Sequence, residues 1–195
     1  KKVSNWRRFY AVINAASVFM EKAPRTVELD RSYSEQNLKY DIAQVRALRA
    51  FAYFYMVRIW GDVPLVTYSY DNGTFPSMPR TDAQTVLSYA KAELLTAIKD
   101  LPYQYGTQTN LYYGSYGAQW QGKLFNKLSA YSVLAHICAW QGNYAEAETY
   151  SSFILDHASE INAKYTSIAD LTSETGLFYS NASVKGSRIL GFNFA

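Results

Sequence analysis

The sequence predicts an all-α fold made of antiparallel helix pairs joined by long irregular loops. Apolar residues recur every three or four positions in five separate segments, which is the spacing of one face of an α-helix. A near-identical segment also occurs twice, as Tyr89–Glu93 and Tyr144–Glu148, each time downstream of a predicted helix that ends at glycine. We therefore expect helices at about residues 4–22, 40–60, 81–100, 123–141 and 143–157.

The composition is that of a globular chain. Of its 195 residues 49% are hydrophobic and only 18% are charged, which argues against disorder. The chain has no apolar run long enough for a membrane span, and its net charge of +3 is too small to indicate nucleic-acid binding. A single cysteine, Cys138, allows no internal disulfide.

The first two predicted helices carry different apolar stripes. The wide stripe of the first predicts a buried helix, and its members are Trp6, Phe9, Tyr10, Val12, Ile13, Ala16, Ser17 and Phe19. The stripe of the second consists of Val45, Leu48, Ala52, Tyr55 and Ile59. This second helix is expected to end at Gly61, because glycine adopts a left-handed cap at little cost and Pro64 follows.

The third helix is expected to start at Thr81, with Gln84 completing a capping box, and to end before Pro102. Its inward positions are Val86, Ala90, Leu94 and Ile98.

The last two predicted helices are separated by Gly142. The inward face of the fourth consists of Leu124, Leu128, Tyr131, Ala135 and Cys138. Asn143 is expected to cap the fifth, with Glu146 at its third position and Ala147, Tyr150 and Ile154 facing inward.

Three irregular stretches, 23–39, 61–80 and 102–123, separate these helices. The third holds five tyrosines and a tryptophan among four glycines, so its aromatic rings belong to no helical stripe. A loop of this length inside a compact domain usually serves a function or is disordered.

The duplicated segment and its flanks resemble the tetratricopeptide (TPR) pattern, in which small residues let two antiparallel helices pack closely. Two pairs are too few for a free solenoid, so we expect them to pack against another part of the protein. Residues 1–20 do not resemble a signal peptide, and 189–195 resemble a strand without a visible partner. We interpret 1–195 as a single region of a longer protein.

Two adjoining segments carry a closer resemblance. Residues 43–54 form a Leu-Arg-Ala aromatic run, and Arg58–Val66 form a Gly-Asp-Val-Pro-Leu turn. Together with the order of the other segments from Trp6 to Phe194, they resemble the SusD-like (RagB/SusD) nutrient-binding outer-membrane lipoproteins. The family usually has an acidic residue where Gln44 stands, which we expect to alter one ion pair.

The resemblance implies a protein held by a lipidated N-terminal cysteine on the outer face of a Gram-negative outer membrane. It implies binding of oligosaccharides or other nutrients and their delivery to a TonB-dependent porin. Neither the lipidated cysteine nor the family's C-terminal half is expected within this chain. A TPR-type interaction scaffold without a small ligand is the alternative.

The polar residues do not indicate an enzyme. No phosphate loop, dinucleotide fingerprint, zincin motif or nucleophile elbow is present. His136, Cys138 and His157 lack the spacing of a zinc site, so neither a metal nor a cofactor is expected. Glu28 and Asp30 would share a side of an extended segment, although a carboxylate site there has little support.

Two arginines on one helix leave two interpretations open. Arg46 and Arg49 are three residues apart, so they can grip an anion together. An ion pair with a neighbouring helix is the better-supported interpretation.

The aromatic loop is the candidate ligand contact. Its rings can stack on the C–H face of a pyranose while amide side chains bond the hydroxyls. The candidate residues are Tyr103, Tyr105, Asn110, Tyr112, Tyr113, Tyr116 and Trp120. Aromatic residues are also favoured at protein interfaces, so packing against the porin or the rest of the protein is an open alternative.

Overall fold

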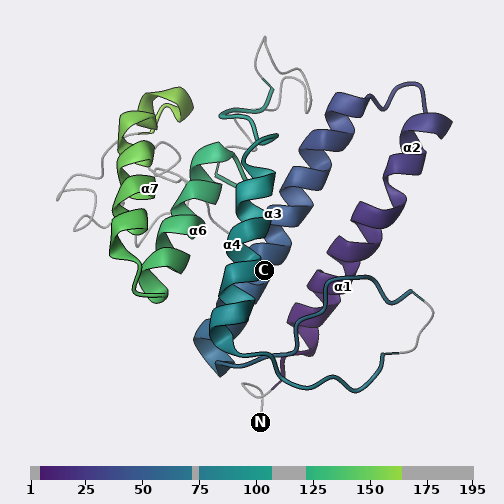
Figure 1. The fold of residues 1–195 in the computed structure, drawn as a ribbon. Coiled ribbons are helices and arrows are strands. Elements are labelled where there is room, and N and C mark those ends of the chain that lie inside the picture. Colours follow the sequence, from purple (N-terminus) through teal and green to yellow (C-terminus); the bar gives the residue numbers. More distant parts are fainter. Residues whose placement is uncertain (1–4, 72–74, 107–121, 164–195) are drawn as a thin grey trace, which may run out of the picture.

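A computed structural model describes residues 5–71, 75–106 and 122–163, and every regular element within these ranges is helical (Figure 1). The elements are α1 (Arg7–Lys22), α2 (Pro24–Leu29), α3 (Glu35–Trp60), α4 (Ala83–Ala97), α6 (Lys127–Trp140), α7 (Tyr144–Asp156) and a 3₁₀ turn (Ala158–Ile161). The predicted all-α class is therefore confirmed. The expected strand at 189–195 lies outside the described residues.

The helices form a row in which each packs on the next, in the order α7, α6, α4, α3 and α1 (Figure 1). Two antiparallel pairs, α3 with α4 and α6 with α7, make up the TPR-like part of this row. Helix α1 covers the side of α3 that faces away from α4. The first pair thus has the cover that an end repeat requires.

The prediction that residues 23–39 are irregular is wrong for much of this segment. It contains α2 and the first turn of α3. Ala23 keeps helical backbone angles (φ −59°, ψ −33°), and Pro24 at a first helical position loses no hydrogen bond. Helix α3 begins early because the Ser34 hydroxyl accepts a bond of 3.1 Å from the Asn37 N–H.

The helix ends follow the cap chemistry, with two corrections. Helix α4 is capped by Asp82, not Thr81, because the Asp82 carboxylate accepts from Thr85 N–H at 2.9 Å. Helix α6 begins later than predicted, at a capping box made by Asn126 and Ser129. The predicted cap of α7 is confirmed, with Asn143 accepting from Glu146 N–H at 3.3 Å.

The glycine stops of α3 and α6 are confirmed as well. Gly61 has a φ of 69° and Gly142 a φ of 79°, which are values that favour glycine.

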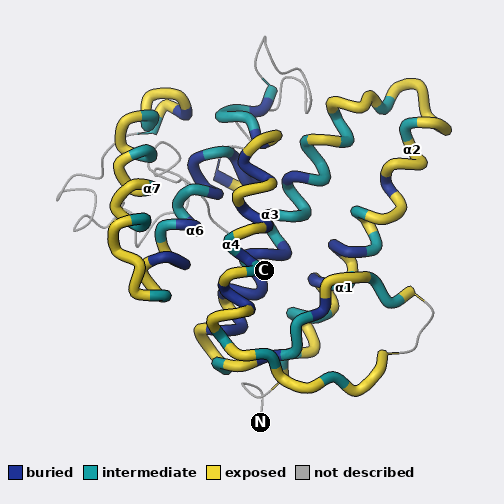
Figure 2. The backbone as a smooth tube through the Cα atoms, viewed as in Figure 1, coloured by how far each residue is buried: buried dark blue, intermediate teal, exposed yellow. Residues whose placement is uncertain are grey.

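The core lies along α3, α4 and α6, whose facing sides are buried (Figure 2). Helix α3 packs on α1 and α4 at once, so its buried face is wider than one stripe. Small residues, Ala43, Ala47 and Ala50, allow this close approach. Four predicted inward residues are exposed instead, namely Val12, Phe19, Tyr55 and Ile59. They lie on sides of α1 and α3 that the other described helices leave uncovered.

The insert between α3 and α4 is attached along α1. Its ends meet in an antiparallel bridge between Val63 and Thr81. The Tyr10 hydroxyl donates to Pro64 O at 2.7 Å, and the Asn14 amide bonds both backbone groups of Tyr70, at 2.9 and 2.7 Å. The position of α1 therefore fixes the position of the insert.

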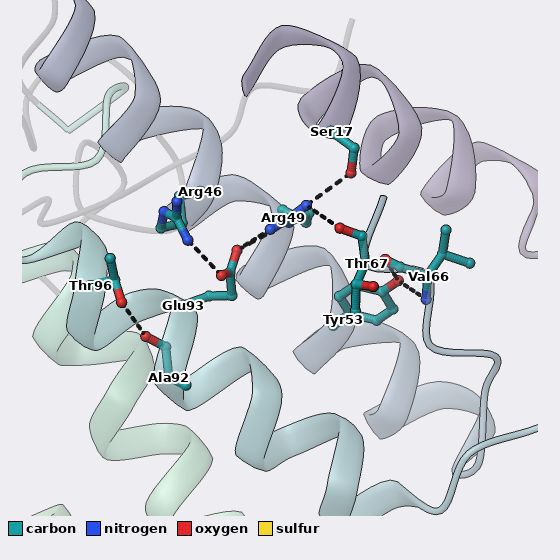
Figure 3. Close-up of polar contacts among 9 residues, drawn as sticks. All are labelled: Ser17, Arg46, Arg49, Tyr53, Val66, Thr67, Ala92, Glu93 and Thr96. Atoms are coloured by element: carbon teal, nitrogen blue, oxygen red, sulfur yellow. Dashed lines mark hydrogen bonds and ion pairs between the residues drawn. The ribbon is translucent and has the colours of Figure 1, made fainter. Parts of the chain in front are cut away.

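A buried ion pair joins these parts (Figure 3). Arg49 of α3 donates from Nε to Glu93 of α4 at 3.1 Å and forms a second, shorter bond to the same oxygen. Arg46 bonds the other Glu93 oxygen at 2.7 Å. The remaining Arg49 nitrogen donates to Ser17 of α1 at 2.9 Å and to Thr67 O of the insert at 3.5 Å. The predicted ion pair between helices is confirmed.

The duplicated segment joins the two helix pairs to each other. Lys91 and Glu146 occupy the third position of the two copies, and Lys91 Nζ lies 2.7 and 2.5 Å from the Glu146 carboxylate oxygens. The fifth positions differ, because Glu93 is buried whereas Glu148 is exposed.

Replacing Glu93 by Gln is expected to lower the free energy of unfolding by about 3 kcal/mol, because it leaves the Arg49 charge buried without a counter-charge. Urea denaturation followed by circular dichroism measures this change. Glu148→Gln, at the equivalent exposed position, is the matched control and is expected to change stability by less than about 0.5 kcal/mol. Equal stabilities of the two variants would contradict the role of the ion pair.

The hydrogen bond from Lys91 lowers the pKa of Glu146. Since the folded-state pKa lies below the unfolded one, the pair stabilises the fold above the unfolded pKa and loses this effect as pH falls through the folded pKa. Glu146→Gln is therefore expected to be less stable than the parent at pH 7, and the difference is expected to shrink as the pH falls through the lowered pKa of Glu146. A difference that persists in acid would argue against this pair. Thermal melts across pH measure it.

Candidate functional site

The aromatic loop that follows α4 starts on a stack of rings. The Tyr103 ring lies parallel to His157, with centroids 5.9 Å apart, and His157 stacks on Phe153 at 4.0 Å. The ring centroid of Tyr131 lies 4.2 Å from that of Phe153 and 5.7 Å from that of Tyr150. The first residue of the predicted site is therefore continuous with the aromatic packing between α6 and α7.

Further contacts hold Tyr103, its stacking partner His157 and the next residue, Gln104. Lys127 Nζ lies 5.2 Å from the Tyr103 ring centroid, a cation–π distance. His157 sits at the C-terminal end of α7, as expected, and its Nδ1 lies 2.9 Å from Phe153 O. The Gln104 amide donates to Glu160 O.

Tyr105 and Gln44 close the base of the loop. Tyr105 is 7% exposed, and its hydroxyl donates to Phe125 O at 2.9 Å. Gln44 of α3 accepts from Phe125 N–H at 2.9 Å and donates to Phe125 O and the Tyr105 oxygen. Lys127 N–H also donates to Pro102 O at 2.9 Å. The two ends of the loop are thus fixed side by side on α3.

The structure separates the predicted site residues into two groups. Tyr103 is half-buried and Tyr105 is buried, and both anchor the base of the loop. The other predicted contacts, Asn110, Tyr112, Tyr113, Tyr116 and Trp120, lie outside the described residues.

The structural role of Gln44 was not predicted from the sequence. An amide both donates and accepts, so it satisfies the N–H and the C=O of one residue, which a carboxylate cannot do. In this chain Gln44 bonds both backbone groups of Phe125. The signal was the amide itself, which can bond an N–H and a C=O at once.

The other polar candidates do not converge. Glu28 lies on α2, and Asp30 accepts two bonds from Ser32, which lower the pKa of Asp30. The prediction that Glu28 and Asp30 share one side of an extended segment is therefore wrong. His136 is exposed, whereas Cys138 is buried, which raises the pKa of its thiol. Over the described ranges no group of three His, Cys, Asp or Glu side chains is placed to hold a metal ion.

Arg46 and Arg49 also carry no anion site in this arrangement, because Glu93 already accepts bonds from both guanidinium groups. None of the described helices is both long enough and apolar enough to cross a membrane.

The similarity to known proteins decides the family. No family model matches the sequence. A crystal structure of a SusD superfamily protein from Bacteroides thetaiotaomicron VPI-5482 is 98% identical over 99% of this chain and 42% of its own, with a TM-score of 0.91. The chain belongs to the SusD-like family. The SusD-like protein P38 of Formosa agariphila is 31% identical over 147 residues, which are 74% of this chain.

More distant SusD-like proteins share the fold. A laminarin-binding SusD-like protein of known structure is 25% identical, with a TM-score of 0.62 over 84% of this chain and 31% of its own. This SusD-like chain spans about a quarter of the length of protein P38 and 42% of the protein from Bacteroides thetaiotaomicron. The TPR-like class predicted from sequence is confirmed.

Replacing Gln44 by Ala is expected to cost about 2 kcal/mol of unfolding free energy, since it removes two bonds to the buried Phe125 backbone. Gln36→Ala, at an exposed position of the same helix, is the control and is expected to be nearly neutral. Chemical denaturation measures both. If Gln44→Ala were as stable as Gln36→Ala, the bonds to Phe125 would not hold the loop base.

Proposed function

We propose that this chain is part of a protein that binds an oligosaccharide at the outer surface of a bacterium and passes it to a TonB-dependent porin. Membership of the SusD-like family is the observation that carries the proposal. A 25% identical member of the family is a laminarin-binding protein. Attachment by a lipid anchor on the extracellular face of the outer membrane, from a segment outside this chain, is part of the same proposal.

The geometry of the loop base supports a binding role. A loop rich in tyrosine gains affinity when its ends are fixed before the ligand arrives, because less conformational entropy is lost on binding. Here Gln44 and Tyr105 fix one side of the base, and the stack of Tyr103 on His157 fixes the other.

We assign the ligand contacts to the aromatic loop. The proposed contacts are Tyr103, Asn110, Tyr112, Tyr113, Tyr116 and Trp120. Tyr105, which is buried, is proposed to hold the base of the loop in place for them. Rings supply apolar faces for the pyranose, and Asn110 supplies an amide for its hydroxyls.

We also propose that the protein does not cleave its ligand, since the sequence contains no recognised catalytic motif. Incubation of the purified protein with its bound polysaccharide, followed by chromatography of the products, tests this point. Appearance of shorter oligosaccharides would overturn it.

A protein-interaction scaffold is the second candidate, and one surface favours it. Trp140 is 52% exposed and Tyr55 is 38% exposed, and the Arg58 guanidinium lies 5.5 and 5.3 Å from their ring centroids. Tryptophan, tyrosine and arginine are the residues most enriched at the energetic centres of protein interfaces. This surface joins α3 to α6 and is separate from the loop base.

The central test replaces Tyr112, Tyr113 and Trp120 by Ala in the whole protein. Loss of three stacking faces is expected to weaken glycan or porin binding at least tenfold (roughly the effect of two or three aromatic contacts) while helicity stays unchanged. Calorimetry against a panel of polysaccharides and a porin pull-down measure the two affinities.

The control is Tyr144→Ala, which removes a tyrosine that is 72% exposed on α7. Unchanged affinity of the triple variant for both partners would remove the aromatic loop from the site. Failure of the parent protein to bind any polysaccharide or the porin would overturn the proposed function itself.

A further inference from the structure

A second group of exposed rings lies on the insert between α3 and α4. The Tyr70 ring centroid is 4.9 Å from that of Tyr68 and 4.7 Å from that of Phe75. Tyr68 is 50% exposed and Phe75 is 52% exposed, so each presents about half of its surface to solvent. Tyr10 of α1 supports the group from below, 6.2 Å from Phe75. We call Tyr68, Tyr70 and Phe75 the insert platform.

The backbone of the insert platform is held in place from α1. Both backbone groups of Tyr70 bond the Asn14 amide, at 2.9 and 2.7 Å. Ser69 donates from N–H and hydroxyl to Glu21, at 2.9 and 2.5 Å. Exposed aromatic rings on a segment with this many attachments are already arranged for a ligand, which lowers the entropy lost on binding.

The insert platform is separate from the base of the aromatic loop. Figure 1 shows the insert beside α1, whereas the base of the loop lies at the other end of the α3–α4 pair, next to α6 and α7. The contacts agree, because the loop base bonds α3 at Gln44 and stacks on α7 at His157.

The chemistry of the insert platform suits a sugar. The Tyr70 hydroxyl donates to the Tyr68 oxygen at 2.6 Å, which leaves the Tyr68 proton and a Tyr70 lone pair for a ligand hydroxyl. This bond raises the pKa of Tyr70 to about 12, so Tyr70 keeps its proton at neutral pH. The rings beside the two hydroxyls offer apolar faces to the C–H groups of a pyranose.

The nearby charges favour an uncharged ligand. Lys22 pairs with Asp71 at 2.5 Å, and the Glu21 carboxylate is bonded to Ser69. A ligand would therefore be recognised by the aromatic rings and the tyrosine hydroxyls of the insert platform. We propose that the insert platform is a second carbohydrate-contact surface, for a neutral oligosaccharide, and this inference rests on the proposed carbohydrate-binding function.

The variant test compares Tyr68→Ala/Phe75→Ala with the parent and with Tyr144→Ala, the exposed tyrosine of α7, in the whole protein. Affinity electrophoresis uses gels that contain neutral polysaccharides, with laminarin and xyloglucan as the first probes. The double variant is expected to lose roughly tenfold in affinity for the polysaccharide that retards the parent. Tyr68→Phe keeps the ring and is expected to lose less, and Tyr144→Ala is expected to bind normally.

A footprint on the unmodified protein makes the test independent of folding of the variants. Hydroxyl-radical oxidation of Tyr68 and Phe75, read by mass spectrometry, is expected to fall when the polysaccharide is added, whereas oxidation of Tyr144 is not. Circular dichroism confirms that the double variant retains its helices.

The outcomes separate the two hypotheses. Retardation of the parent and of the double variant to the same extent would overturn the insert platform and leave the proposed function standing. Retardation of neither protein by any polysaccharide would overturn both. Protection of Tyr68 and Phe75 before any polysaccharide is added would show that a protein segment covers the rings, and would also overturn the inference.

Discussion

The arrangement of the helices depends on one buried interaction, the ion pair between Arg49 and Glu93. A buried guanidinium is destabilising unless its donors are paired, so every element that reaches Arg49 must supply an acceptor. Helix α4 supplies the Glu93 carboxylate, α1 supplies the Ser17 hydroxyl, and the insert supplies Thr67 O. Tyr89 lies beside the guanidinium, with its ring centroid 5.7 Å from Arg49 Cζ. One side chain thus specifies how three separate segments meet on α3.

This constraint reaches the insert platform and the base of the aromatic loop. Because Ser17 and Thr67 fix α1 and the insert on the same arginine, the attachments from Asn14 and Glu21 can hold the insert at a defined place. On the other side, α3 carries Gln44, whose amide bonds the backbone of Phe125 and so closes the aromatic loop. The insert and the base of the aromatic loop are therefore both held by α3 and the helices packed on it. A rigid helical support for variable loops is a common way to build binding surfaces.

The sequence predicted those features that arise from local chemistry. The helices follow from apolar spacing, and the cap of α7 follows from Asn143 with Glu146. Helix α2 was missed because six residues are too few to show a period, and Pro24 is more often a breaker than a first residue. The exposure of Tyr55 could not be predicted, since it depends on which faces of α3 the neighbours cover. The same holds for the site, because Gln44 and Phe125 meet through the tertiary fold alone.

The exposed aromatic rings of the insert could not be predicted from the sequence pattern of this segment. Tyr68 and Tyr70 are two residues apart, so in an extended segment they point to one side, and the Phe75 ring packs against Tyr70. The sequence alone does not predict that these rings are exposed to solvent, because aromatic rings are usually buried to a large extent. They stay there because the bonds that hold the segment are made by backbone and polar groups, Asn14 with Tyr70 and Glu21 with Ser69, and none of them requires burial of the rings. Stability of the insert and exposure of its rings are therefore separable, and such a separation is the physical condition for a surface that binds a ligand without refolding.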